Sequence, residues 1–302
     1  MKHTHFLFLL LVPFVFSCND DENDIGGTIE KGQIIDTVFY EGFERSYLVY
    51  VPQGYDGKEP IPMWLNFHPS LTFDSILYTH VEFTGFGELS EMENFILVSP
   101  KAGKDTGGTL RWNVDKEPEL PDDISFVNHL IDIVSSKYNV DEERIYATGY
   151  SSGAFMSFAL ACDLSERIAA IAGSAGYLGA SYVPNPPYNG VCNPSRPIAV
   201  LQIHGNLDPT VPYVGVQPSL NVWIEHNNTS TTPTVDTIDM NPSDGQWVEQ
   251  FLYPDGEQGC EVEHLKIYGA NHNYSNYDGS KEIKDIEEFW KFISQFDIHG
   301  KR

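Results

Sequence analysis

Residues 144–160 read "RIYATGYSSGAFMSFAL" and place a β-rich run directly before a run with helical character. Between the two runs, Gly149, Ser151 and Gly153 form the pattern G-x-S-x-G. A strand before this pattern and a helix after it predict a nucleophile elbow, a turn that holds its central serine in a strained conformation above a sheet. The flanking glycines are expected because a Cβ atom there would collide with the neighbouring strand and helix. The spacing therefore selects Ser151, and not Ser152, as the nucleophile.

A serine nucleophile needs a base and a carboxylate that orients the base. In chains with this elbow the acid and then the histidine follow the serine. Asp208 lies in "LQIHGNLDPTVPY" after a predicted strand, and His272 lies in "IYGANHNYSNY" after the last predicted strand. Open α/β sheets place their active sites at such strand ends. The sequence therefore predicts a triad of Ser151, Asp208 and His272.

Other histidines after the elbow compete for the role of base. His204 ends a predicted strand, so it is expected to shape the loop that carries the acid. His264 lies in a strand of alternating polarity, and His226 lies beside a polar stretch; both are expected at the surface.

Predicted strands and helices alternate along the chain from about residue 33. A hairpin is predicted from "QIIDTVFYEG" and "RSYLVYVP", and buried strands from "IPMWLNFH" and "NFILVSP". Helices are predicted in "PDDISFVNHLIDIVSSKYNV", after the elbow, and in "KEIKDIEEFWKFISQF". This alternation predicts an α/β fold with a mostly parallel central sheet and helices on both faces. Residues 33–302 are expected to form one catalytic domain, with residues 227–245 as a polar surface excursion.

The first 18 residues, "MKHTHFLFLLLVPFVFSC", have a basic start and an apolar run too short to span a bilayer comfortably. They predict a signal peptide. The ending resembles a bacterial lipobox in which Cys18 carries the lipid; ordinary signal cleavage beside a chance cysteine is the alternative. Residues 19–32 are predicted to be a flexible acidic tether. We therefore expect an exported outer-membrane lipoprotein, exposed at the cell surface, or alternatively a secreted or periplasmic protein.

The formal net charge of −25 repels phosphate backbones and anionic membranes. Nucleic acid is therefore not expected as a partner, and any membrane attachment is expected through the lipid anchor alone. Besides Cys18 the chain has three cysteines, and no two are spaced as C-x-x-C, so no zinc site is expected.

The segments around the elbow, around Asp208 and in "GANHNYS" resemble the polyhydroxybutyrate depolymerase and feruloyl esterase family, also called LpqC-like esterases. "ERSYLVYVPQGYD" and "LRWNVD" share the resemblance, which extends from about residue 33 to 295. It implies an α/β-hydrolase fold, the same triad, no metal or cofactor, and cleavage of carboxylic esters in polyester or in ester-decorated plant polysaccharide. A monomer is expected. A disulfide between Cys162 and Cys192 is expected because both lie in segments that match the family, whereas Cys260 does not.

Two features depart from the family. Where the family usually has His-Gly, this chain has His68 followed by Pro69, which has no N–H to donate. The oxyanion hole is therefore expected to use the amide of Ser152 and that of Ser70 or Leu71. The family often has a tryptophan shortly after the catalytic histidine, and this chain has tyrosines there instead. The expected substrate-binding residues are Trp112, Tyr150 and Tyr274; a buried structural role is the alternative for Trp112.

The function predicted from the sequence is a serine esterase acting on feruloyl or acetyl esters of plant polysaccharide through an acyl-enzyme. A polyester depolymerase or another serine hydrolase, including a peptidase, is the first alternative. A surface lipoprotein that binds glycan without catalysis is the second, and the change at Pro69 is its only support.

Overall fold

The computed structural model describes residues 29–71, 85–105, 107–179, 184–185, 188–189, 192–273 and 282–302. The predicted signal peptide, Cys18, most of the predicted tether and Tyr274 lie outside these residues. In the described part of the chain no helix is long and apolar enough to cross a membrane.

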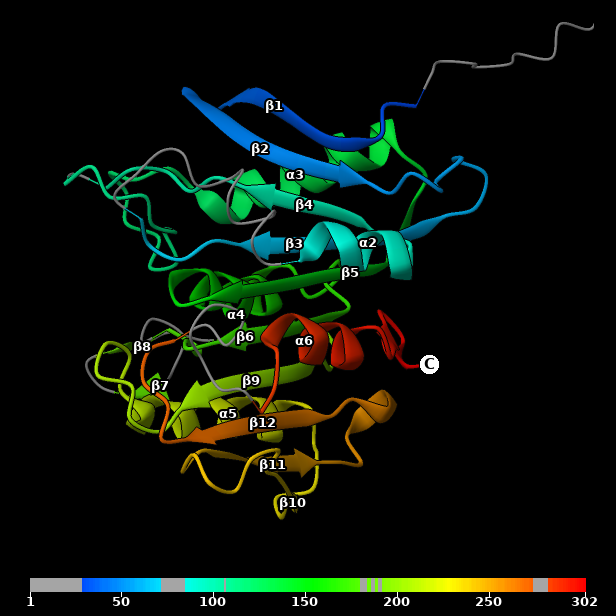
Figure 1. Ribbon diagram of the computed structural model, residues 1–302. Helices are drawn as coiled ribbons and strands as arrows, with labels where there is room; N and C mark the ends of the chain where they lie inside the picture. The colour runs from blue at the N-terminus through cyan, green and yellow to red at the C-terminus, as the bar shows by residue number, and fades with distance from the viewer. Residues whose placement is uncertain are drawn as a thin grey trace, which may run out of the picture.

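One large sheet organises the described residues (Figure 1). Its strand order is β1-β2-β4-β3-β5-β6-β9-β12-β11-β10. The interior strands, from β4 to β12 in this order, are parallel, and the strands at both edges are antiparallel to their neighbours. The strands are β1 (Gly32–Tyr40), β2 (Phe43–Val51), β3 (Ile61–Phe67), β4 (Ile96–Pro100), β5 (Val140–Tyr150), β6 (Ala170–Ser174), β9 (Ala199–Gly205), β10 (Thr234–Ile238), β11 (Trp247–Tyr253) and β12 (Val262–Tyr268).

Helices cover both faces of the sheet (Figure 1). One face packs against α3 (Asp123–Lys137), α4 (Ser152–Asp163) and α5 (Val216–His226). The other face packs against α2 (Phe86–Glu93) and α6 (Asp285–Ile293). Short elements complete the described structure: the hairpins β7 (Pro184–Asn185) with β8 (Tyr188–Asn189) and β13 (Phe296–Asp297) with β14 (Gly300–Lys301), and the 3-10 turns η1 (Tyr213–Gly215) and η2 (Glu257–Gly259).

The local signals in the sequence explain the interior elements. Every side chain of β3 and β9 is buried, as expected for parallel strands that are covered on both faces. Helix α3 begins where its capping residue predicts, because the side chain of Asp122 accepts a hydrogen bond from the amide of Ser125. These features confirm the predicted α/β architecture with a mostly parallel sheet.

Residues 227–245, the predicted surface excursion, include a strand that the sequence analysis did not predict. These residues contain β10, which pairs with β11 at the edge of the sheet, and neither strand is expected from the sequence. Four of the five side chains of β10 are exposed, so its composition resembles that of a loop. Its conformation is stabilised by backbone hydrogen bonds to β11, which leave no hydrophobic pattern in the sequence.

Candidate active site

Ser151 lies in the turn between β5 and α4 with φ 53° and ψ −118°, the strained conformation that the elbow predicts. Its amide donates to the carbonyl of Ser174 at 2.9 Å, which fixes the turn against β6. A Cβ atom at Gly149 would lie 2.3 Å from the backbone of Gly153, and one at Gly153 would lie 1.9 Å from the oxygen of Phe67. Both glycines are therefore required by close backbone approach, as expected.

The structure brings the three predicted triad residues together. His272 Nδ1 lies 2.7 Å from Asp208 Oδ2, and His272 Nε2 lies 3.0 Å from Ser151 Oγ. An ionised carboxylate can only accept, so the Nδ1 atom carries the proton and donates it. The Nε2 atom is then free to accept the proton of the Ser151 hydroxyl. This is the tautomer that a general base needs.

Asp208 is held rigidly beneath the histidine. Its side chain is fully buried, and its Oδ1 atom accepts the amides of Thr210 and Val211, each at 2.8 Å. The imidazole of His204 also approaches Asp208, with 3.3 Å between His204 Nε2 and Asp208 Oδ2. With its other lone pairs engaged by the loop, the carboxylate directs Oδ2 towards His272.

The loops that carry the acid and the histidine are fastened to each other. The amide of Leu207 donates to the carbonyl of Ala270 at 3.0 Å, and Asn206 Oδ1 accepts the amide of Gly269 at 2.8 Å. A Cβ atom at Gly205 would lie 2.5 Å from the oxygen of Ala270, so only glycine permits this approach. The distance between Asp208 and His272 thus rests on direct contacts between the two loops that carry them.

Two buried histidines support the acid loop. His204 Nε2 donates to the carbonyl of Val211 at 2.8 Å, which is the structural role expected of it. The expectation that His264 lies at the surface is wrong, because its side chain is buried. Its Nδ1 atom is hydrogen-bonded to the carbonyl of Gln202 at 2.9 Å, and its Nε2 atom to the Tyr213 hydroxyl at 2.8 Å. Burial lowers the pKa of His204 and lowers that of His264 to about 3, so both rings are neutral. The third histidine, His226, is partly buried and its Nε2 bonds a backbone carbonyl.

Tyr150 contacts His272 from the elbow side. Its hydroxyl donates to the carbonyl of His272 at 2.9 Å, and the two rings lie 5.2 Å apart. Burial raises the pKa of this phenol, which keeps it a hydrogen-bond donor. The described contacts of Tyr150 are therefore with the histidine loop, and its predicted contact with substrate stays a prediction.

The prediction that Trp112 lines the substrate site is wrong, because its side chain is 1% exposed. The ring packs edge-on against Phe67 with 5.1 Å between centroids, and its Nε1 donates to the carbonyl of His68 at 2.9 Å. The alternative, a buried structural role, holds. An aromatic residue in an irregular segment gives no periodic signal, so the sequence alone did not separate the two.

The candidate oxyanion hole lies between the start of α4 and the segment after β3. The segment approaches the helix closely, since Gly153 faces the oxygen of Phe67. The amide of Ser152 lies in the first turn of α4 and has no partner among the described residues, so it is available as a donor. The positive end of the helix dipole adds to its effect.

The prediction of Leu71 as the second donor is wrong. Its amide donates to the carbonyl of Leu110 at 3.0 Å, and the amide of Leu110 returns a hydrogen bond of 2.8 Å. Pro69 has no N–H. Ser70 lies between them, is exposed, and its amide has no partner in the described part of the chain. Ser70 is therefore the remaining candidate from this segment.

His68 shapes the same segment, a role that the sequence analysis missed. Its Nδ1 lies 2.6 Å from the carbonyl of Pro69, and its Nε2 accepts the amide of Ala102 at 3.0 Å. Burial lowers its pKa to about 4, so the ring is neutral and can donate through one nitrogen and accept through the other. The sequence feature that could have indicated this role is the position of His68 directly after a fully buried strand.

Cys162 and Cys192 are joined by a disulfide, which is the expected pairing. Cys260 is buried with a free thiol, and burial raises its pKa to about 11, which makes it unreactive. The described residues contain no cluster of His, Cys, Asp or Glu that could hold a metal ion.

Comparisons with known proteins find similarity to carboxylic ester hydrolases. A family model described as phospholipase/carboxylesterase matches residues 110–249, which include Ser151 and Asp208 but not His272. The chain is 24% identical over 262 residues to a bifunctional acetylxylan esterase/xylanase of Neocallimastix patriciarum, covering 86% of this chain and 34% of that protein. It thus spans about a third of that relative. It is also 24% identical over 305 residues to feruloyl esterase D of Neurospora crassa, covering 97% of both.

A solved structure, the acetyl xylan esterase from Aspergillus awamori, matches with a TM-score of 0.61 at 15% identity, covering 86% of this chain and 99% of that one. This likeness shows the fold. The chain has an α/β-hydrolase fold and is similar to feruloyl and acetylxylan esterases, as the sequence resemblance implied. The matches support the class of carboxylic ester hydrolases.

Proposed function

We propose that this chain is a serine esterase that cleaves feruloyl or acetyl esters of plant polysaccharide. The observation that carries the proposal is the position of His272, hydrogen-bonded through Nδ1 to Asp208 and through Nε2 to Ser151. This arrangement can activate a serine hydroxyl at neutral pH without a metal or a cofactor. The substrate class follows from the relatives, which are named as acetylxylan and feruloyl esterases.

In the acylation step, Ser151 Oγ attacks the ester carbonyl carbon and its proton passes to His272 Nε2. Asp208 stabilises the imidazolium that forms and keeps its Nδ1 proton directed at the carboxylate. When the tetrahedral intermediate collapses, the C–O bond to the alcohol breaks, and His272 returns the proton to the leaving sugar oxygen. The acid becomes an ester of Ser151.

The negative charge on the tetrahedral oxygen requires preorganised donors. The amides of Ser152 and Ser70 are the candidates, because each is a backbone N–H without a partner in the described structure. Such a donor is worth on the order of 100- to 1,000-fold in kcat. In deacylation, water attacks the acyl carbon while His272 takes its proton, and the same two amides stabilise the second intermediate. The bond from that carbon to Ser151 Oγ then breaks, His272 returns the proton to Oγ, and the carboxylic acid leaves.

No specific observation favours a polyester depolymerase, a peptidase or a glycan-binding protein without activity. A binding protein would not need the acid, base and hydroxyl in hydrogen-bonding register, and it would not need a serine held at φ 53°. We therefore keep one function and treat the others as outcomes of the substrate test below.

We further propose that the protein is exported and anchored by a lipid on Cys18. The support is the sequence of residues 1–18, which lie outside the described structure. An anchor at the N-terminus, followed by a short acidic tether, would hold the hydrolase at a surface where polymeric substrates are available.

The experiment that tests the function is a substrate panel assayed with the parent and with Ser151→Ala. The panel contains methyl ferulate, acetylated xylan, a p-nitrophenyl acyl ester and a short hydroxybutyrate oligomer. We expect release of ferulate or acetate by the parent and none above background by the variant. Cleavage of the oligomer alone would replace the proposed substrate class, and no cleavage of any ester would leave the glycan-binding alternative.

A further inference from the structure

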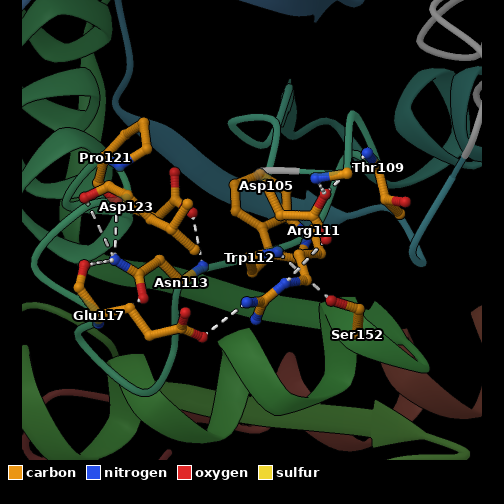
Figure 2. Close-up of polar contacts among 11 residues, drawn as sticks. Asp105, Thr109, Arg111, Trp112, Asn113, Glu117, Pro121, Asp123 and Ser152 are labelled. Atoms are coloured by element: carbon orange, nitrogen blue, oxygen red, sulfur yellow. Dashed lines mark hydrogen bonds and ion pairs between the residues drawn. The ribbon is translucent and has the colours of Figure 1, made fainter.

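The segment Leu110–Asn113 contacts both halves of the candidate oxyanion hole. Its first residue, Leu110, forms a two-way bridge with Leu71, at the end of the segment that carries Ser70. Its third residue, Trp112, binds the carbonyl of His68 through the indole Nε1 at 2.9 Å. The main-chain N–H of Trp112 points to Ser152 Oγ at 3.4 Å (Figure 2). One short segment thus touches Ser152 and residues on both sides of Ser70.

We propose that Trp112 is a positioning residue that sets the distance between the two oxyanion donors, Ser152 N–H and Ser70 N–H. This inference rests on the proposed esterase function. Trp112 does not touch substrate, because its side chain is buried. It acts through the backbone of His68 and through the side chain of Ser152, which belong to the two sides of the hole.

Pro69 explains why the Ser70 amide needs contacts that orient it. A loop with glycine can turn its amides towards the substrate, whereas proline fixes φ near −65° and offers no donor. The carbonyls on either side of the Pro69 nitrogen are both held: that of His68 by the Trp112 indole at 2.9 Å and that of Pro69 by the His68 ring at 2.6 Å. Between these contacts and the bridge at Leu71, the orientation of the Ser70 amide is fixed from both sides.

The segment is itself anchored on both sides of Trp112 (Figure 2). Before it, the guanidinium of Arg111 forms ion pairs with Asp105 at 3.3 Å and with Glu117 at 2.6 Å. After it, the amide of Asn113 donates to Asp123 Oδ2 at 2.7 Å, and Asp123 is paired with the buried Arg45. A tryptophan between two anchored neighbours can hold other groups in place without moving itself.

The side chain of Asn113 adds a second set of anchors (Figure 2). Its Nδ2 donates to the carbonyls of Glu117 at 3.0 Å and Pro121 at 3.1 Å, and its Oδ1 accepts the amide of Glu117 at 2.8 Å. These contacts close the irregular chain between Asn113 and Pro121 into a compact turn. The turn leads directly into α3, which begins at Asp123.

The test is Trp112→Phe, which keeps a buried ring and removes the indole N–H. Two matched variants exist in the same chain. Trp223→Phe removes a buried indole whose Nε1 has no partner in the described residues. Trp64→Phe removes one that donates to Thr148 Oγ1 at 2.7 Å and packs on the opposite face of the sheet from Trp112, with α2 and α6. The three variants make the same change of volume, so only the hydrogen bond and its place differ.

We expect Trp112→Phe to lower kcat by about 10-fold or more with KM changed by less than about twofold, because a displaced donor acts only on the transition state. Trp64→Phe and Trp223→Phe are expected to lower the melting temperature without this loss of kcat. The rate of inactivation by diethyl p-nitrophenyl phosphate, which also places negative charge in the hole, should fall with kcat for Trp112→Phe alone. A kcat and an inactivation rate within twofold of the parent would overturn the proposal.

If Trp112→Phe does not fold, Ser152→Ala tests the other contact, because it removes the acceptor of the Trp112 N–H and keeps the donor amide. We expect a kcat lowered severalfold, and an unchanged kcat would overturn the proposal. Failure of the function itself looks different: the parent would neither hydrolyse any ester nor react with the phosphate. The parent's reactivity therefore separates the two conclusions.

Discussion

His272 Nε2 lies 3.0 Å from Ser151 Oγ, although 121 residues separate the two along the chain. The serine is positioned by a strand-to-helix turn and the histidine by a loop that is fastened to the Asp208 loop. The hydrogen bond between them therefore forms only when the elbow turn, the Asp208 loop and the His272 loop are all in place. The proposed chemistry depends on this hydrogen bond.

Ser151→Ala is expected to lower the rate of ester hydrolysis by roughly 10⁶-fold, as the loss of a triad serine does. Ser152→Ala is expected to cost far less, because its backbone N–H survives. Steady-state rates with a p-nitrophenyl ester measure both. A Ser152→Ala variant that is more damaged than Ser151→Ala would show that the nucleophile has been assigned to the wrong serine.

Pro69→Gly tests whether the proline is part of a rebuilt oxyanion segment. The contacts at His68, Pro69 and Leu71 hold the segment around Ser70, so we expect the more flexible glycine to lower kcat severalfold with KM unchanged. If the present hole instead lacks a donor, the glycine would recover one and raise kcat by up to about 100-fold. A kcat within twofold of the parent would show that this segment does not limit the chemistry.

Acid is expected to destabilise the fold through its buried neutral histidines. Burial lowers the pKa of His68 to about 4 and that of His264 to about 3, both below the ordinary pKa of histidine, about 6.5. Between pH 6.5 and each lowered pKa, the unfolded chain binds a proton that the folded chain does not. With respect to these two histidines, the free energy of unfolding is therefore highest above pH 6.5 and falls as the pH drops. Each histidine contributes about 1.4 kcal/mol per pH unit in that window.

Urea unfolding at pH 7, 6, 5 and 4.5 measures this slope. The control is His264→Gln, whose amide can still donate one hydrogen bond and accept another but does not titrate. Its free energy of unfolding should depend on pH less steeply than that of the parent, because unfolding of the variant takes up about one proton fewer. An identical slope in parent and variant would mean that His264 does not remain neutral in the folded protein.

Reduction of the disulfide between Cys162 and Cys192 is expected to lower the free energy of unfolding by roughly 3–4 kcal/mol, from the 30-residue separation that it closes. Dithiothreitol should therefore lower the melting temperature of the parent and of Cys260→Ala by the same amount. It should have no effect on a Cys162→Ser, Cys192→Ser double variant. A peptide map of the unreduced protein with Cys260 in a bridge would contradict the pairing.

Cys18→Ser is expected to move the protein from the membrane fraction to the soluble fraction of cells that express the full chain. Stable attachment needs more than one acyl chain, and a lipoprotein cysteine carries them. Fractionation followed by immunoblotting measures the change, with Cys260→Ala as the variant that keeps the anchor. Unchanged partitioning of Cys18→Ser would exclude the lipid on this residue.

Several parts of this protein follow from the sequence because they depend on neighbours along the chain. The elbow at Ser151, the cap at Asp122 and the buried strands β3 and β9 each leave a local pattern of glycine, polar or apolar residues. The chain order of serine, acid and histidine also identified the three residues that meet in the structure. The alternation of predicted strands and helices along the chain was enough to predict the general class of fold.

The remaining features were decided by tertiary contacts that have no periodic signal. The sequence offered Ser70 and Leu71 as equal donors, and the bridge to Leu110, 39 positions away, removed one of them. The sequence did not decide whether Trp112 lines the substrate site or is buried in the interior. It also predicted His264 at the surface, because alternating polarity does not show that a polar ring has hydrogen-bond partners in the interior. The sequence determined which residues could act; the packing of distant segments determined which backbone amides and rings were left free to do so.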